Sequence, residues 1–228
     1  MADLISCDRN AAKIYHHSGI TSTIKTSFAS PYIYPFGLAF EGTDLLSCDY
    51  NSNKVYRHSG ITSTIKTSFS SPSYYTSGLT FEGNDTISCS AYADKIYRHS
   101  GITDTIKASF SSPSGCPYGL TFEGTDLISC DAYADKIYRH SGITSTIKTS
   151  FSSPSSFITG LAFEGNDAIS CDGGTYKIYR HSGITSTIKT SFASPGDYPS
   201  GLTYSELAWQ WDPAQNMPLN LTVSVISY

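Results

Sequence analysis

The chain has 228 residues, enough for one large domain or two small ones, and its 39% hydrophobic and 15% charged residues exclude both a disordered and a membrane-embedded protein. The 15 basic and 19 acidic residues give a net charge of -4 and do not cluster, so we expect no nucleic-acid partner. No apolar run reaches the roughly 20 residues of a membrane helix, and residues 1–13 carry charges at Asp3, Asp8 and Arg9 where a signal peptide is apolar. We therefore expect neither membrane insertion nor an export signal.

A unit of 41 residues repeats along the chain. Residues 1–36 match this unit without its first six residues, and residues 201–206 supply the missing opening. The chain thus holds five units, one of them split between its ends, and we predict a single domain over residues 1–206. The glycines that open the unit are Gly37, Gly78, Gly119, Gly160 and Gly201.

Four short strands are predicted in each unit, with turn residues between them. In the unit that begins at Gly37 they span residues 37–42, 44–49, 54–58 and 61–69. The last strand alternates Ile61, Ile65 and Phe69 with Thr, Lys and Ser, as expected of an outer strand that faces water. Four antiparallel strands in 41 residues are typical of a propeller blade. We predict an all-β fold, a five-bladed β-propeller closed into a monomeric ring by pairing of the N- and C-terminal segments.

The wording of the unit resembles a known class of propeller repeat. A proline is followed after five residues by Gly-Leu-x-Phe-Glu-Gly, then Asp-x-Ile-Ser-x-Asp and Lys-Ile-Tyr. NHL and gluconolactonase-like repeats likewise place a proline before Gly-hydrophobic-x-hydrophobic, an aspartate at the end of the second strand and a basic residue at the start of the third. The resemblance spans residues 3–206 and implies the fold, although those relatives usually have six blades. The unit is also similar to repeat arrays in marine phage and environmental sequences.

Five of the six cysteines occupy one position in the second strand: Cys7, Cys48, Cys89, Cys130 and Cys171. Because strands are about 4.8 Å apart, the second strand is expected roughly 12 Å from the axis, which places the cysteines of adjacent blades roughly 14 Å apart. A disulfide requires Cα atoms within about 7 Å. We predict free, buried thiols, which favour cytoplasmic synthesis. Cys116, in a loop, is the one candidate for a reactive thiol. The final location is left open and includes a virion or a cell surface.

Other polar residues recur at fixed positions. Histidines end the third strand, too far apart to share a metal ion, so we expect structural or surface roles for them. An aspartate closes the second strand and is expected to stabilise the next turn, except where Ser90 replaces it. A glutamate ends the first strand in four units, and two interpretations stay open: a ring that binds a cation, or charges tolerated around an aqueous channel. No metal site and no cofactor is predicted. These glutamates are Glu41, Glu82, Glu123 and Glu164.

The units differ mainly in two windows, although near-identical units indicate recent amplification. The first window lies between the fourth strand and the next unit's glycine, at residues 32–36, 73–77, 114–118, 155–159 and 196–200. The second lies between the second and third strands, at residues 9–12, 50–53, 91–94, 132–135 and 173–176. In an antiparallel blade both connections emerge at the same end, so both windows are expected on one face of the disc.

Ten of the 17 tyrosines fall in these windows, with Ser, Gly, Asn and Asp between them. This composition is typical of antibody paratopes and also suits stacking on sugars. We therefore predict a non-enzymatic recognition module that binds a glycan or a protein surface at several blades. The predicted contact residues are Tyr32, Tyr34, Phe36, Tyr50, Tyr74, Tyr75, Tyr92, Tyr118, Tyr133, Phe157, Tyr176, Asp197 and Tyr198.

Two other functions are weighed. A gluconolactonase-like hydrolase requires an asymmetric set of acidic residues, yet 13 of the 19 acidic residues are copies at repeated positions, so we predict no enzyme. A structural or assembly subunit, of a filament or a virion, is kept open by residues 207–228, which belong to no repeat. That tail contains Trp209 and Trp211, and the alternation over residues 219–225 predicts one strand that packs on the ring or extends a neighbour's sheet.

Overall fold

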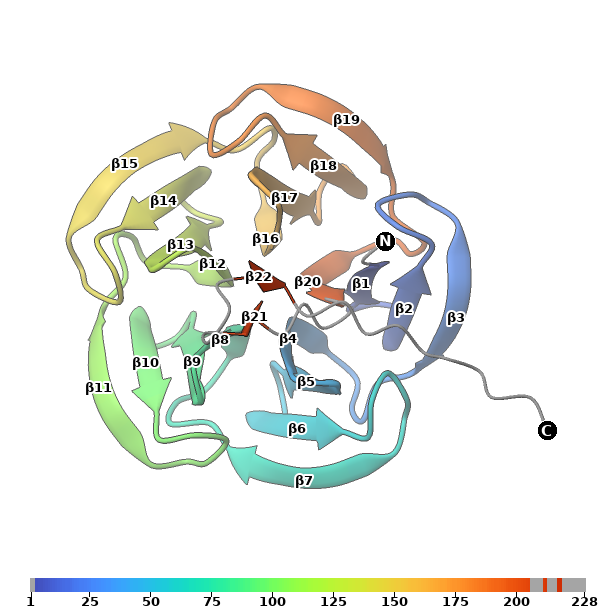
Figure 1. Cartoon of the computed structure of the whole chain (residues 1–228), viewed down its shortest axis with the longest axis vertical. Helices are drawn as coiled ribbons and strands as arrows, with labels where there is room; N and C mark the ends of the chain where they lie inside the picture. The colour runs from blue at the N-terminus through green and yellow to red at the C-terminus, as the bar shows by residue number, and fades with distance from the viewer. Residues whose placement is uncertain (1–2, 206–210, 213–216, 219–228) are drawn as a thin grey trace.

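The computed structural model describes residues 3–205, 211–212 and 217–218. Five four-stranded antiparallel sheets surround a common axis (Figure 1). They are the blades of a five-bladed β-propeller, so the predicted fold is confirmed. Within the described part of the chain, no helix is long and apolar enough to cross a membrane.

Each blade runs from an inner strand at the axis to an outer strand at the rim. Blade 1 holds β20 (Pro199–Ser205), β1 (Asp3–Asp8), β2 (Lys13–His17) and β3 (Ile24–Ala29). Blade 2 holds β4 (Pro35–Glu41), β5 (Asp44–Asp49), β6 (Lys54–His58) and β7 (Ile65–Ser70). Blade 3 holds β8 (Thr76–Glu82), β9 (Asp85–Ser90), β10 (Lys95–His99) and β11 (Ile106–Ser111).

The remaining blades repeat this order. Blade 4 holds β12 (Pro117–Glu123), β13 (Asp126–Asp131), β14 (Lys136–His140) and β15 (Ile147–Ser152). Blade 5 holds β16 (Ile158–Glu164), β17 (Asp167–Asp172), β18 (Lys177–His181) and β19 (Ile188–Ala193). A separate two-stranded sheet joins β21 (Trp211–Asp212) to β22 (Met217–Pro218). The strand predicted over residues 219–225 lies outside the described residues.

The ring is closed by the two ends of the repeat array. Strand β20 pairs antiparallel with β1, and the register places Asp3 opposite Ser205 and Cys7 opposite Gly201. Because an unpaired β1 would leave open backbone groups at the seam, this pairing removes an edge from the sheet. The predicted closure is therefore confirmed.

Glycines let the inner strands meet at the axis. A Cβ atom added to Gly119 would lie 2.7 Å from the backbone nitrogen of Leu161 and 2.9 Å from the carbonyl carbon of Gly160. Gly37 would clash in the same way with the backbone of Gly78 and Leu79. No side chain fits at this level, which explains why each unit opens on glycine.

The blades pack on one another through the residues that flank the second strand. The five cysteines of the second strands, one on each of β1, β5, β9, β13 and β17, are free and at most 1% exposed, as predicted. The histidine that ends each third strand is fully buried and meets, edge to face, a phenylalanine on the outer strand of the preceding blade, with ring centroids 5.4 to 6.1 Å apart. Structural roles are thus observed for these strand-end histidines: His17, His58, His99, His140 and His181.

The outer strand is shorter than the alternation predicts. In blade 2 it begins at Ile65, whereas residues 61–64 form the turn from β6. The carbonyl of Thr62 accepts a hydrogen bond from His58 Nδ1 at 2.7 Å, and the Thr62 hydroxyl donates to the carbonyl of Ser59 at 2.8 Å. These local bonds favour the turn over a continued strand. The apolar Ile61 therefore packs on the core from a turn and not from a sheet.

Candidate functional site

The two variable windows of each blade lie side by side on one face of the disc, which we call the loop face. In blade 2 the backbone nitrogen of Tyr50, in the second window, donates to the carbonyl of Tyr34, in the first, at 2.9 Å. Equivalent bonds join Ala132 to Cys116 and Gly173 to Phe157, both at 3.1 Å. The connections at the opposite end of the blades form the turn face.

The aspartate that closes the second strand ties the two windows together. In blade 4, Asp131 is 1% exposed and accepts hydrogen bonds from the backbone nitrogens of Tyr133 and Ala134 through Oδ1, both at 2.9 Å. Its Oδ2 accepts from the nitrogen of Cys116 at 2.8 Å. The predicted turn-stabilising contact is present, and the same side chain also holds the other window. A charged acceptor buried among backbone donors makes this loop pair rigid.

Proline decides which of two conformations the first window takes. Tyr34, Cys116 and Tyr198 each precede a proline, which favours extended backbone, and each donates its nitrogen to the aspartate of the following second strand at 2.6 to 2.8 Å. Tyr75 and Phe157 have no proline after them and lie in the positive φ region, at 57° and 102°.

The two windows without proline bond to the preceding blade instead. The nitrogen of Tyr75 donates to Asn53 Oδ1 at 2.8 Å, and the nitrogen of Phe157 donates to Asp135 Oδ1 at 3.1 Å. Their own second strands end in Ser90, which has no second oxygen, and in Asp172, whose Oδ2 is buried without a partner. The loss of the aspartate in blade 3 therefore matches the conformation of its first window.

The predicted contact residues separate into three groups by exposure. Six tyrosines are open to solvent, with exposed fractions from 41% to 77%, and Asp197 is exposed as well. Tyr34, Tyr50, Phe157 and Tyr198 are half-buried. Phe36 and Tyr118 are in the core, at 0% and 8% exposure. The six exposed tyrosines are Tyr32, Tyr74, Tyr75, Tyr92, Tyr133 and Tyr176.

The burial of Phe36 and Tyr118 corrects the expectation that every aromatic residue of the windows faces a partner. Both precede the axial glycine and belong to the inner strand, not to a loop. Their rings meet at the axis with centroids 5.3 Å apart. The three other blades carry small residues here, and the hydroxyls of Ser77, Thr159 and Ser200 each donate to a carbonyl of the next blade at 2.6 Å. Two large and three small side chains thus fill the axis beneath the loop face.

We call these five axial residues (Phe36, Ser77, Tyr118, Thr159 and Ser200) the aromatic plug. A chain of ring contacts leads outward from it. Tyr50 packs on Phe36 at 4.9 Å and stacks on Tyr75 at 4.4 Å, and Tyr75 meets Tyr92 edge to face at 6.0 Å. Burial raises the pKa of Tyr50. The exposed rings of blade 3 are therefore held from below by buried ones, which lowers the entropy lost when they contact a partner.

Arg9 is the one arginine at the loop face. Its guanidinium lies over the rings of Tyr34, at 4.8 Å, and Tyr198, at 5.0 Å. Burial raises the pKa of Tyr198 although Arg9 opposes this shift. Blades 3, 4 and 5 have alanine or glycine at the position of Arg9 and cannot make these contacts. Arg9 therefore orders the loop face of blade 1, near the seam of the ring.

Cys116 is not an exposed loop thiol. It is 4% exposed, and burial raises the pKa of its thiol. Cys116 is therefore a poor candidate for a reactive thiol, because a neutral, shielded thiol is a poor nucleophile. The backbone bond from its nitrogen to Asp131, which sequence reasoning did not foresee, turns the side chain into the core.

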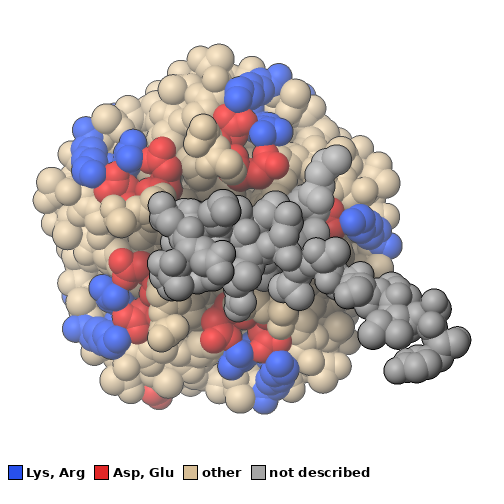
Figure 2. Space-filling view, in the orientation of Figure 1, with Lys and Arg blue, Asp and Glu red and all other residues tan. Residues whose placement is uncertain are grey.

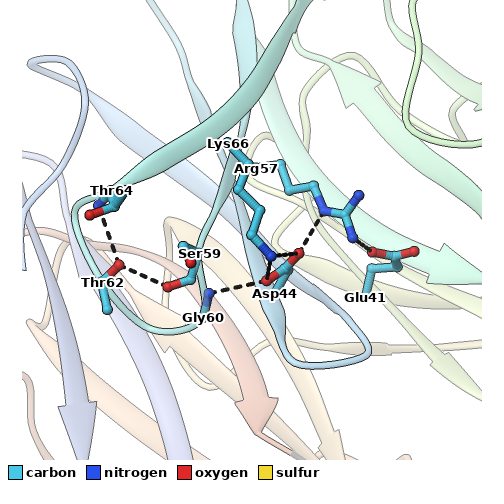
Figure 3. Close-up of polar contacts among 8 residues, drawn as sticks. All are labelled: Glu41, Asp44, Arg57, Ser59, Gly60, Thr62, Thr64 and Lys66. Carbon is cyan, nitrogen blue, oxygen red and sulfur yellow. Dashed lines mark hydrogen bonds and ion pairs between the residues drawn. The ribbon is translucent and has the colours of Figure 1, made fainter.

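The glutamates at the end of the inner strand do not form a free ring around the channel. Figure 3 shows Glu41 paired with Arg57, which also donates from Nε to Asp44 Oδ2 at 2.8 Å. Lys66 pairs with Asp44 at 2.7 Å, and the nitrogen of Gly60 donates to the same carboxylate. Desolvation alone would raise the pKa of the Asp44 carboxylate, but the hydrogen bonds from Lys66 and Gly60 lower it below its ordinary value.

These ion clusters repeat around the turn face, where Figure 2 shows blue and red side chains grouped together in the blades. Blade 1 differs at two places at once, because His16 replaces the arginine and Ser205 replaces the glutamate. The cation-binding interpretation of the glutamates loses its basis, since each carboxylate already has an arginine partner. Among the described residues, no group of three or more acidic, histidine or cysteine side chains is placed to hold a metal ion.

Each blade also buries a serine beside its strand-end histidine. In blade 4, Ser129 Oγ lies 2.8 Å from His140 Nε2, and His140 Nδ1 lies 2.7 Å from the carbonyl of Thr144. Because a carbonyl only accepts, Nδ1 carries the proton and Nε2 accepts from the serine. Burial lowers the pKa of His140, which keeps the ring neutral. Ser129 is 1% exposed, so this pair is a packing element that no substrate can reach.

No protein-family model and no curated protein matches this chain. Solved structures do resemble it. A Nidogen/Laminin complex aligns with a TM-score of 0.61 at 15% identity, covering 90% of this chain and 98% of the other. The glutaminyl cyclase of Myxococcus xanthus aligns with a TM-score of 0.59 at 12% identity over 70% and 77% of the two chains. The WD40 β-propeller domain of Doa1 aligns with a TM-score of 0.57 at 14% identity over 85% and 65%.

The chain is a β-propeller. At such low identity these similarities show the fold alone. The resemblance to NHL and gluconolactonase-like repeats stays a prediction, since nothing in the comparisons names those families.

Proposed function

We propose that this propeller is a non-enzymatic recognition module whose loop face binds a glycan or a protein surface at several blades. The observation that carries the proposal is the set of six exposed tyrosines on loops that hydrogen bonds to polar side chains and contacts between aromatic rings hold in place. Tyrosine offers a large amphipathic surface at low entropic cost, and a preordered loop loses little freedom on binding.

Two features of the described residues fit a binding role. The serine and histidine pairs are buried, and the aspartates of the ion clusters are neutralised by lysine and arginine. Some structural neighbours are enzymes by name, such as glutaminyl cyclase, and others come from binding complexes, so the fold does not decide between the two. The assembly alternative rests on residues 207–228, most of which lie outside the described residues.

Repetition around the ring gives the module multivalency. Separate contacts at neighbouring blades would each be weak, but a repeated ligand that engages two or more gains affinity of about 100-fold or more over a single contact. Blade 3 presents a cluster of three exposed tyrosines, in which the ring of Tyr92 lies 5.8 Å from that of Tyr74 and 6.0 Å from that of Tyr75.

A glycan array probed with the intact protein tests the proposal. We expect binding that weakens stepwise as Tyr74, Tyr92 and Tyr133 are replaced by alanine in combination, with the melting temperature unchanged because these side chains are 64% to 77% exposed. Ile106→Ala, at an exposed site on the outer strand of blade 3, is the matched control and should bind as the parent does. Undiminished binding by the triple variant would refute a loop-face site.

A further inference from the structure

A second concave feature lies on the axis, on the opposite side of the glycine ring from the aromatic plug. It is a cavity of about 390 Å³ whose walls come from the inner strands of all five blades and which reaches Gly42 in the turn after β4. At the glycines themselves the axis has no space for a water molecule. The cavity is therefore blind at the loop face and extends toward the turn face.

The wall of this cavity has three levels. Leucines form the floor, at 1% to 2% exposure, and aromatic side chains form the rim. The middle level holds alanine in blades 2 and 5 and threonine in blades 1, 3 and 4. The floor residues are Leu38, Leu79, Leu120, Leu161 and Leu202, and the rim residues are Phe40, Phe81, Phe122, Phe163 and Tyr204.

The threonines of the middle level carry hydroxyls that the described residues leave without a hydrogen-bond partner. They are Thr80, Thr121 and Thr203, and Thr121 is only 9% exposed. Elsewhere in the structure, buried hydroxyls such as those of Ser77 and Thr159 donate to a carbonyl at 2.6 Å. Thr121 is the most buried of the three, and hydroxyls that face a cavity without a protein partner favour a bound molecule that supplies one.

We propose that the axial cavity binds a small, neutral, amphipathic molecule: an apolar ring or short chain that fills the space between leucine floor and aromatic rim, with one hydroxyl or carbonyl group at the threonine level. The size suits such a ligand, since it lies within the range of small-molecule pockets. The expected charge is zero, because none of the described residues that line the cavity is acidic, basic or histidine, and an ion there would have no partner among them.

The proposal is independent of the loop-face function, because floor and plug separate the two sites. The ring itself offers matched variants. Thr121→Ala and Thr80→Ala reproduce what Ala39 and Ala162 already are, so they remove hydroxyls without risk to the fold. Ala162→Leu adds apolar volume at the same level, where Ala162 is 2% exposed, and we expect it to narrow the cavity. Tyr133→Ala, on the loop face, is the control.

The test uses the intact chain and the neutral dye N-phenyl-1-naphthylamine, whose emission rises in apolar surroundings. We expect binding of one dye per chain, a loss of at least tenfold in affinity in Ala162→Leu, and no change in Tyr133→Ala. Displacement by 1-naphthol should be stronger than by naphthalene, and the Thr80→Ala/Thr121→Ala variant should lose about fivefold of the affinity for naphthol only, as expected for one hydrogen bond.

Two results would overturn the proposal. One is dye binding that Ala162→Leu leaves intact, or that Tyr133→Ala removes. The other is no dye binding by the intact chain. A shift of tryptophan emission in Ala162→Leu would then identify the segment that carries Trp209 and Trp211 as the occupant. If Ala162→Leu does not fold, the naphthol preference and its loss in the threonine variant decide alone.

Discussion

The aspartate at the end of the second strand provides a test in which one substitution is made at two equivalent positions. Asp131→Ser keeps an oxygen for the nitrogens of Tyr133 and Ala134, as Ser90 does in blade 3, but leaves the nitrogen of Cys116 without its partner at 2.8 Å. Asp172→Ser loses no such bond, because Oδ2 of Asp172 has no partner. A buried hydrogen bond to a charged group contributes about 2 kcal/mol, so Asp131→Ser should be less stable than Asp172→Ser by about that amount.

The difference is measurable by thermal and urea denaturation of the two variants side by side. For a chain of this size, about 2 kcal/mol corresponds to roughly 4 to 8 °C in melting temperature. The urea slope should be the same in both variants, since neither changes the surface exposed on unfolding. Equal melting temperatures would show that the proline-dependent choice between the two window conformations is not what decides the use of the aspartate.

Three further outcomes are expected. The free energy of unfolding should fall as the pH drops from 7 to 5, because burial lowers the pKa of the five strand-end histidines. Below a pH of about 6.5 the unfolded chain takes up protons that the folded chain does not, so the slope can reach about 7 kcal/mol per pH unit. A flat profile in urea titrations would contradict this. The loss should continue below pH 4, where hydrogen bonds from Lys148 and Gly142, which lower the pKa of Asp126 to about 2, are given up. A thiol reagent should label none of the six cysteines of the native protein, Cys116 included, and all six in denaturant; early labelling of one equivalent would restore Cys116 as reactive. Gly119→Ala should cost about 2 kcal/mol or more, whereas Gly115→Ala, with its nearest neighbour at 3.9 Å, should cost far less by the same denaturation assay.

The fold was predictable because the 41-residue period fixes the number of blades, and each unit carries four strand patterns between turn residues. Where the observed strands differ from the predicted ones, hydrogen bonds between side chains and backbone are the reason. Residues 61–64 alternate as a strand does, yet the bonds from His58 Nδ1 to the Thr62 carbonyl and from the Thr62 hydroxyl to Ser59 bend them into a turn. The alternation of a sequence shows which side chains are apolar. It does not show where a local hydrogen bond of the turn is preferred to a backbone hydrogen bond of the sheet.

The position of the variable windows was predictable from strand direction, but the depth of each residue was not. Phe36 and Tyr118 looked like Tyr74 in sequence, and only their place just before the axial glycine marks them as strand residues. The alternation of two large and three small side chains at that level, Phe36 and Tyr118 against Ser77, Thr159 and Ser200, is a packing signal visible only once the five units are read as a ring. The ion pairs of the glutamates were not predicted for a related reason, since their arginine partners come from the third strand, 16 residues away in blade 2.

The seam between β20 and β1 has a consequence for the order of events during synthesis. The bond from the nitrogen of Asp3 to Ser205 spans 202 positions, so β1 must wait for β20 before it can pair. Blades 2 to 5 are built from contiguous chain and can form in succession, while β1 holds an open edge until residue 205 emerges. We therefore expect the seam to close after blades 2 to 5 have formed, and the nascent chain to be open to strand exchange with neighbouring nascent chains until then.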